Sequence, residues 1–119
     1  MVTGIGVDLV EIGRFRTEDD LSGFLRQILT EKEISEHGGL HADPALCARI
    51  FAAKEAVLKA LGCGLAGGWS WRDVEITSDF RVVLSGGAGR LAQERSMRKI
   101  HIVQSCSGGY AMALAIAEA

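Results

Sequence analysis

One uninterrupted helical segment constrains the fold of this chain more than any other feature. Asp43 is a good N-cap residue. Pro44, the only proline, suits the first helical position because its φ is preset and its missing N–H needs no partner there. No helix breaker follows until Gly62, which is placed to end the helix. We therefore predict a helix of about five turns over residues 44–61.

The last segment of the chain indicates what packs against that helix. Between residues 110 and 117 every second residue is alanine, and the residues between the alanines are larger and apolar. In a strand this alternation puts all the alanines on one face. Such a face lets a helix approach closely, and the long predicted helix is the natural partner.

Turn signals and periodicity divide the remaining chain into short elements. In chain order they are a strand over 4–10, a helix over 21–29, a helix that begins at the capping box Thr30–Glu33 and stops at Gly38-Gly39, strands over 73–77 and 81–85, a helix over 89–99, and a hairpin of 100–105 with 110–117. These elements predict an α+β fold, a mostly antiparallel sheet wrapped against one long central helix, in a single domain over residues 1–119.

Two carboxylates stand among small residues. On the long helix, Glu55 and Lys59 lie one turn apart on a stripe whose other members are alanine and glycine. Asp8 lies on the strand face that it shares with Gly4 and Gly6. Mg²⁺ usually takes one or two protein carboxylates and leaves its other positions to water and phosphate oxygens. Together with a lysine that neutralises phosphate, this pattern predicts a site for a charged ligand.

The spacing of Asp8, Glu55 and Lys59 fits a ligand site, but it also fits a second interpretation. Glu55 and Lys59 are spaced as an ordinary exposed i, i+4 ion pair, and Asp8 would then merely end a strand. The glycine-rich run 85–89 precedes a predicted helix and could cradle a phosphate, although such runs more often form simple strand-to-helix turns.

Two longer motifs favour the ligand site. Residues 4–12, GIGVDLVEI, followed by Arg14 and Phe15, resemble the opening of the holo-(acyl-carrier-protein) synthases. Residues 51–62, FAAKEAVLKALG, are similar to the second signature of that family. The resemblance covers essentially the whole chain, and two signatures in the right order at the right separation are specific.

The resemblance implies a 4′-phosphopantetheinyl transferase fold and activity. Such an enzyme moves the phosphopantetheine arm of coenzyme A onto a serine of apo-acyl carrier protein and releases adenosine 3′,5′-bisphosphate. Members of the family are homotrimers with active sites at subunit interfaces. The positive mean hydropathy of this short chain fits an apolar surface that another copy covers.

The resemblance also implies roles for individual residues. Asp8 and Glu55 would hold Mg²⁺ against the diphosphate, Lys59 would sit on the phosphates, and these three would be the catalytic residues. Glu55, directly or through water, could take the serine proton. Arg14 would belong to the docking surface for acyl carrier protein. The residues implied to contact coenzyme A are Lys54, Lys59, Gly62, Gly64, Ser105 and Cys106.

Four departures from the family pattern lie in regions expected to grip coenzyme A. Cys106 stands where a histidine is usual, and a thiol is a poor hydrogen-bond donor. Ile50 replaces an arginine, Cys63 replaces a threonine, and the segment 77–81 is too short to contain the usual Gly-Lys-Pro. We therefore expect altered coenzyme A recognition. A catalytically impaired paralogue that binds carrier protein without efficient transfer remains the alternative, followed by a nucleotide-phosphate hydrolase that uses the same carboxylates.

Composition narrows the partners and the cellular location. The formal net charge of −2 gives no support to a nucleic-acid or membrane-surface role. No secretory signal opens the chain, and no apolar run approaches the ~20 residues of a spanning helix. The three cysteines show no C-x-x-C spacing, so neither a disulfide framework nor a zinc site is indicated. These features predict a cytoplasmic protein.

Overall fold

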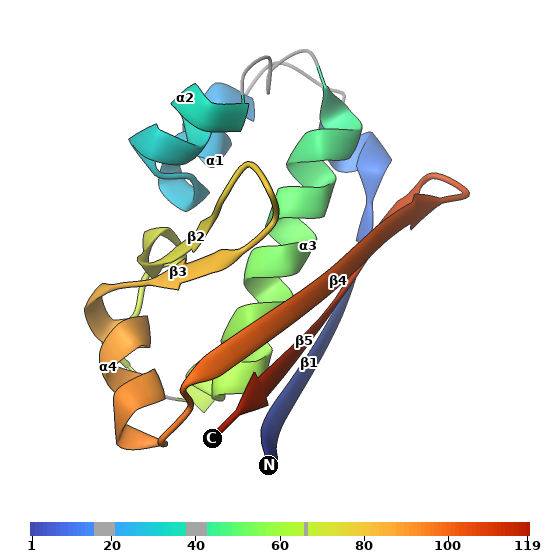
Figure 1. The fold of residues 1–119 in the computed structure, drawn as a ribbon. Helices are drawn as coiled ribbons and strands as arrows, with labels where there is room; N and C mark the ends of the chain where they lie inside the picture. Colours follow the sequence, from blue (N-terminus) through green and yellow to red (C-terminus); the bar gives the residue numbers. More distant parts are fainter. Residues whose placement is uncertain (16–20, 38–42, 66) are drawn as a thin grey trace.

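Helix α3 (Pro44–Leu61) forms the centre of the fold, with a three-stranded sheet on one side and smaller elements on the other (Figure 1). The computed structural model describes residues 1–15, 21–37, 43–65 and 67–119. The predicted helix ends are confirmed. The Asp43 side chain accepts a hydrogen bond from Leu46 N at 3.0 Å, and Gly62 ends the helix in the left-handed conformation with φ of 78°.

The three-stranded sheet consists of β1 (Val2–Glu11), β5 (Tyr110–Glu118) and β4 (Lys99–Ser107), with β5 in the middle and both pairings antiparallel. The alanine face of β5 is completely buried and packs against α3, as the sequence predicts; it consists of Ala111, Ala113, Ala115 and Ala117. The opposite face of the sheet carries large apolar side chains that remain exposed.

Two glycines let β1 lie against the backbone of α3. A Cβ atom at Gly4 would lie 2.2 Å from the carbonyl oxygen of Ala60, and one at Gly6 would lie 1.9 Å from that of Ala56. Neither carbonyl can move without deforming the central helix. The close approach also brings Asp8, two residues further along the same face, to the surface of α3.

The contact at Gly6 makes a prediction about stability. Gly6→Ala is expected to lower the free energy of unfolding by about 3 kcal/mol, because the new methyl group overlaps helix backbone. The matched control is Gly23→Ala on α1 (Leu21–Ile28), where an added Cβ meets nothing within 4 Å. Denaturant titration should show the control at wild-type stability or slightly above it. Equal stability of the two variants would contradict the packing described here.

The other side of α3 is covered by α1, α2 (Glu31–His37) and a two-stranded sheet of β2 (Val74–Ile76) and β3 (Val82–Leu84). The predicted capping box is confirmed: Thr30 N donates to Glu33 Oε1 at 2.8 Å, and Glu33 N donates to Thr30 Oγ1 at 3.0 Å. The predicted stop at Gly38-Gly39 lies outside the described residues. None of the helices in the described ranges is long and apolar enough to cross a membrane.

Two predicted elements differ from the structure. The five strands form two sheets rather than one. Helix α4 covers Gly86–Glu94 instead of residues 89–99, and Lys99 opens β4. The early start follows from tertiary contacts, because the Asp73 carboxylate accepts a bond from Ala88 N at 3.3 Å. The early end coincides with Ser96, whose φ of 55° is incompatible with a continuing right-handed helix.

Candidate functional site

Asp8 and Lys59 meet where β1 crosses α3. Lys59 Nζ donates to Asp8 Oδ1 at 2.9 Å and to the carbonyl oxygen of Val7 at 3.1 Å. The Asp8 side chain is only 14% exposed, whereas that of Lys59 is 52% exposed. The glycines of β1 make this contact possible, since they bring the strand next to the helix. Lys59 therefore pairs with Asp8, not with Glu55 in an isolated i, i+4 ion pair.

Glu55 lies one turn before Lys59 and belongs to the same cluster. Burial raises the pKa of the Glu55 carboxyl, and the negative charge of Asp8 raises it further, while Lys59 and Arg14 act in the opposite direction. The negative charge of Asp8 therefore reaches Glu55 and opposes the ionisation of its carboxyl. A cation bound between them would relieve that repulsion.

Arg14 borders the cluster from the turn that follows β1. It lies in the 3-10 helix η1 (Ile12–Phe15), and its guanidinium carbon is 5.6 Å from the centre of the Phe51 ring. Phe51 lies one turn before Glu55 on α3. Arg14 is exposed, so its charge is available at the rim of the cluster.

The donor set fits Mg²⁺. Asp8 on β1 and Glu55 on α3 are both partly exposed, and the charge of Asp8 acts on Glu55. In the ranges that the structure describes, no three or more His, Cys, Asp or Glu side chains gather as a closed metal cage. Mg²⁺ typically binds through one or two carboxylates and completes its shell with water and substrate oxygens. The cluster has the chemistry of such an open site.

The residues implied to contact coenzyme A do not all reach this cluster within one chain. Ser105 and Cys106 lie on β4, the edge strand opposite β1. Asp8 faces Ala113 of β5, which faces Gln104 of β4, so two strand spacings of about 5 Å separate Asp8 from the β4 edge. Gly62 and Gly64 lie at the end of α3. The structure thus brings together Asp8, Glu55, Lys59 and Arg14 but not the β4 residues.

Comparison of the sequence with known proteins shows which family the chain belongs to. The family model for the 4′-phosphopantetheinyl transferase superfamily matches residues 4–115. The chain belongs to this superfamily. The holo-(acyl-carrier-protein) synthase of Geotalea daltonii is 38% identical over 99% of both chains. That of Vibrio cholerae strain M66-2 is also 38% identical, over 99% of this chain and 98% of the other.

Solved structures give the same result for the fold. The holo-(acyl-carrier-protein) synthase of Neisseria meningitidis superposes with a TM-score of 0.80 at 30% identity over 100% of both chains. The Helicobacter pylori synthase, solved in complex with coenzyme A, has a TM-score of 0.75 at 25% identity, over 96% of this chain and 99% of the other. The predicted fold class, family and type of enzyme are confirmed.

Lys54 requires a correction, because the structure buries it completely instead of presenting it to coenzyme A. Its ammonium donates to Glu33 Oε1 at 2.7 Å, to the Ile28 carbonyl at 2.6 Å and to the Trp71 carbonyl at 3.2 Å. Burial lowers the pKa of Lys54, and the charge of Glu33 opposes this change. With these acceptors and no exposed surface, Lys54 has no free donor for a ligand of the transferase.

Sequence reasoning missed the role of Arg49 at the β4 edge. Its Nε donates to Gln104 Oε1 at 2.7 Å, and its guanidinium carbon lies 4.8 Å from the centre of the Phe80 ring. Ile50, which stands where the family resemblance leads us to expect arginine, is completely buried. Arg49 therefore places a positive charge beside Gln104, two residues before Cys106 on β4. The sequence feature that could have indicated this role is Arg49 itself, which lies one residue before position 50, where an arginine is expected.

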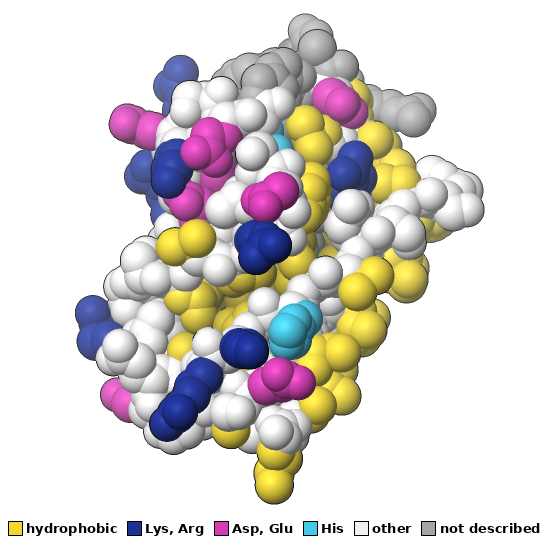
Figure 2. All heavy atoms as spheres, viewed as in Figure 1, with side chains coloured by type: hydrophobic (Ala, Val, Ile, Leu, Met, Phe, Trp, Pro, Cys, Tyr) yellow, Lys and Arg dark blue, Asp and Glu magenta, His cyan; other side chains and the backbone are white. Residues whose placement is uncertain are grey.

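A groove beside the same edge is lined with basic side chains above an apolar floor (Figure 2). It runs between the turn after β2 and the first half of β4, and its lining includes Arg81, Arg98, Lys99 and His101. Two of these basic side chains have acidic partners, since Arg81 pairs with Asp79 at 3.2 Å and His101 lies 3.3 Å from a Glu118 oxygen. The groove is a second place where this transferase presents positive charge.

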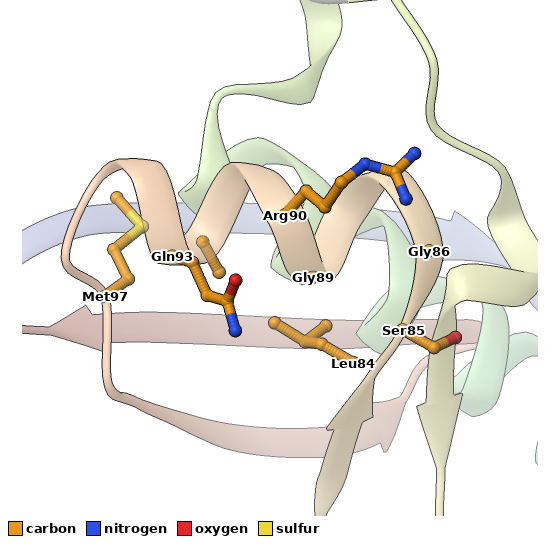
Figure 3. Close-up of a pocket in the computed structure, with 8 residues that line it drawn as sticks. Leu84, Ser85, Gly86, Gly89, Arg90, Gln93 and Met97 are labelled. Carbon is orange, nitrogen blue, oxygen red and sulfur yellow. The ribbon is translucent and has the colours of Figure 1, made fainter.

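The glycine-rich start of α4 does not favour a phosphate site. The Asp73 carboxylate already accepts from Ala88 N there, and its charge would repel an anion. Figure 3 shows the adjacent pocket, in which the Arg90 guanidinium extends away from Leu84 and Gln93. The run 85–89 is better interpreted as a strand-to-helix turn.

The cysteines give a labelling prediction. Burial raises the pKa of Cys47 to about 11 and also raises that of Cys63, whereas Cys106 is exposed on β4. A disulfide reagent that labels free thiols should therefore modify about one cysteine per native chain and all three in denaturant. Cys106→Ser should remove the native reaction. Rapid native labelling that survives Cys106→Ser would contradict the burial of the other two thiols.

Proposed function

We propose that this chain is a holo-(acyl-carrier-protein) synthase that transfers the 4′-phosphopantetheine arm of coenzyme A to a serine of apo-acyl carrier protein. The second product is adenosine 3′,5′-bisphosphate. The observation that carries the proposal is the cluster of Asp8, Glu55 and Lys59, formed by both family signatures, in a chain of the phosphopantetheinyl transferase superfamily. Residues 1–119 would act as a single transferase domain.

The chain's own side chains suit the transfer step. The half-exposed ammonium of Lys59 can donate to phosphate oxygens while its other contacts hold it over β1. Glu55, one turn before Lys59 on the same helix, is the carboxylate placed to take the serine proton, directly or through water. Asp8 keeps Lys59 in place by their ion pair.

We further propose that Asp8 and Glu55 hold Mg²⁺ when coenzyme A binds. The ion would supply positive charge against the diphosphate as charge develops on the leaving oxygen. The two side chains fit because they are paired acids at an open surface. Arg14, at the rim, would contact the acidic acyl carrier protein and so orient its serine toward the cluster.

The exposed face of the sheet supports a homotrimer with sites at subunit interfaces. Its β1 and β5 strands expose apolar side chains to an extent unusual for a free surface; among them Ile5 is 62% exposed, Val7 53%, Leu9 61% and Met112 47%. A neighbouring copy that covers this face could also place its β4 edge beside the Asp8 cluster. Ser105, Cys106 and the nearby Arg49 would then contact coenzyme A together with Lys59, Gly62 and Gly64 of the first copy.

Partners and location follow from the same proposal. The partners are acyl carrier protein, coenzyme A and further copies of this chain, with no nucleic acid and no membrane. A chain with a net charge of −2 has no overall electrostatic attraction to nucleic acid, which is also negatively charged. We propose that the protein is cytoplasmic, where coenzyme A is used.

One observation favours a second candidate function. Cys106 is exposed where the family resemblance implies a histidine, and Ile50 is buried where it implies an arginine, so neither side chain would give coenzyme A a strong hydrogen bond. A chain that binds carrier protein but transfers the arm inefficiently is the alternative.

Intact-protein mass spectrometry separates the two functions. Purified chain, apo-acyl carrier protein, coenzyme A and Mg²⁺ are expected to give carrier protein heavier by one phosphopantetheine arm, together with adenosine 3′,5′-bisphosphate. Complex formation without the mass gain would support the impaired paralogue. Phosphate release without carrier protein would support a hydrolase. Cys106→His is the matched variant, and it should lower the KM for coenzyme A if the missing imidazole weakens binding.

The raised pKa of Glu55 predicts a pH-dependent stability. The folded chain binds this proton more tightly than the unfolded chain, so stability is lost as pH rises above the usual value of 4.5 toward the raised one. Without divalent cations, Glu55→Gln should therefore melt at a higher temperature than wild type at pH 7.5, and the difference should vanish near pH 4. Glu36→Gln, at an exposed site on α2, is the control. Identical melting of Glu55→Gln and wild type at pH 7.5 would contradict this account.

A further inference from the structure

A fully buried ion pair lies on the side of α3 that faces away from the three-stranded sheet. The side chains of Lys54 and Glu33 are both 0% exposed and meet at 2.7 Å. Every polar atom of the pair has partners, and the described residues contain no buried side-chain nitrogen or oxygen without one. Removing two charges from water is so unfavourable that well-packed apolar residues often give equal or greater stability. Stability alone therefore explains this pair poorly.

The pair connects nearly everything that packs on that side of the helix. Lys54 binds the end of α1 through the Ile28 carbonyl and the 3-10 helix η4 (Trp71–Asp73) through the Trp71 carbonyl. Glu33 binds the start of α2 and, through Oε2, the backbone N–H of Ile76 in β2 at 2.8 Å. One ammonium and one carboxylate thus attach α1, α2, η4 and β2 to a single position on α3.

That position directly precedes Glu55. Successive residues point about 100° apart around a helix, so Lys54 is directed to the smaller elements while Glu55 senses the charge of Asp8 on β1. A rotation of α3 by about 20° would move a carboxylate on its surface by about 2 Å. Misplacement of a reacting group by about 1 Å can lower a rate about 100-fold. The rotation of α3 therefore decides whether Glu55 and Asp8 can share one ion.

We propose that Lys54 and Glu33 are positioning residues of the transferase site. Their ion pair fixes the rotation of α3 from the side opposite the sheet and so holds the Glu55 carboxylate beside Asp8. This inference deepens the proposed function and rests on it. It assigns Lys54, a residue of the second signature, to the geometry of the metal site rather than to contact with coenzyme A.

The test is the double variant Lys54→Met/Glu33→Gln, which removes both charges together and leaves no unpaired one. Turnover is measured by the transfer assay, with kcat and the KM for coenzyme A determined separately. Mn²⁺ affinity in the presence of coenzyme A is measured without carrier protein by electron paramagnetic resonance. Circular dichroism and thermal melting check the fold. Val74→Ala, at a buried site on β2 away from Glu55, is the control for a general loss of core packing.

The double variant is expected to lower kcat at least 10-fold and Mn²⁺ affinity at least 5-fold, with the KM for coenzyme A within twofold of wild type. Val74→Ala should melt earlier but keep kcat and Mn²⁺ affinity. If kcat and Mn²⁺ affinity of the double variant stay within twofold of wild type, the proposal is overturned and the pair serves folding only. Should the double variant not fold, Lys54→Gln/Glu33→Gln, which also removes both charges and keeps a hydrogen-bond donor at position 54, is judged by the same readouts. A wild type without transfer would refute the proposed function, and the Mn²⁺ titration would still decide the positioning role.

Discussion

Asp8→Asn is expected to lower kcat/KM for phosphopantetheine transfer by about 10³-fold, the scale on which one electrostatic stabiliser of a transition state acts. The amide keeps the shape of the side chain but removes the negative charge that would bind the cation and that pairs with Lys59 at 2.9 Å. The loss should appear in kcat at saturating coenzyme A. The transfer assay with apo-acyl carrier protein measures it.

The matched control is Glu11→Gln, which removes a carboxylate from the exposed end of the same strand. It should leave kcat within about twofold of wild type, because surface changes away from a site have small effects. Thermal melting must show that Asp8→Asn remains folded. A folded Asp8→Asn protein with wild-type transfer would exclude a catalytic role for this carboxylate.

Val7→Glu is expected to dissociate the assembly and to reduce transfer at least 100-fold. Val7 is 53% exposed on the outer, apolar face of β1, and a carboxylate there would be buried without a partner when a second copy covers the face. The structure of the single chain should be unaffected, since the side chain points away from α3. Light scattering coupled to size exclusion gives the oligomeric state, and the transfer assay gives the activity.

Val83→Glu provides the comparison, because Val83 is 50% exposed on β3 of the other sheet. It should leave both the proposed trimer and the activity unchanged. A monomeric Val7→Glu protein with wild-type activity would show that one chain forms a complete site. A trimeric Val7→Glu protein would show that another surface joins the copies.

The elements that local chemistry determines were predictable from the sequence. The cap residues at Asp43 and Gly62 and the capping box at Thr30 act through backbone groups of their own neighbours. The alanine face of β5 predicts close packing because its methyl groups leave room for a helix to approach. Gly4 and Gly6 mark the strand that lies on the helix, and Asp8 follows on the same face.

The remaining features depend on contacts between distant segments. Helix α4 begins early because the Asp73 carboxylate binds its first turn, which glycine propensity alone does not predict. The residues next to Lys54 in the sequence do not indicate whether its side chain faces solvent or Glu33. The packing of α1 and α2 against α3 determines that it faces Glu33. The exposure of Cys106 and the contacts of Arg49 likewise follow from the position of β4 beside α3.

We propose that Asp8 and Glu55 together bind a divalent cation against coenzyme A. Electron paramagnetic resonance of Mn²⁺ tests it directly, because free and bound ion differ in signal and no turnover is needed. Wild type should bind Mn²⁺ more tightly with coenzyme A than without it, and Asp8→Asn and Glu55→Gln should each weaken the coenzyme-dependent binding at least 10-fold. Wild-type Mn²⁺ affinity in both folded variants would contradict the account.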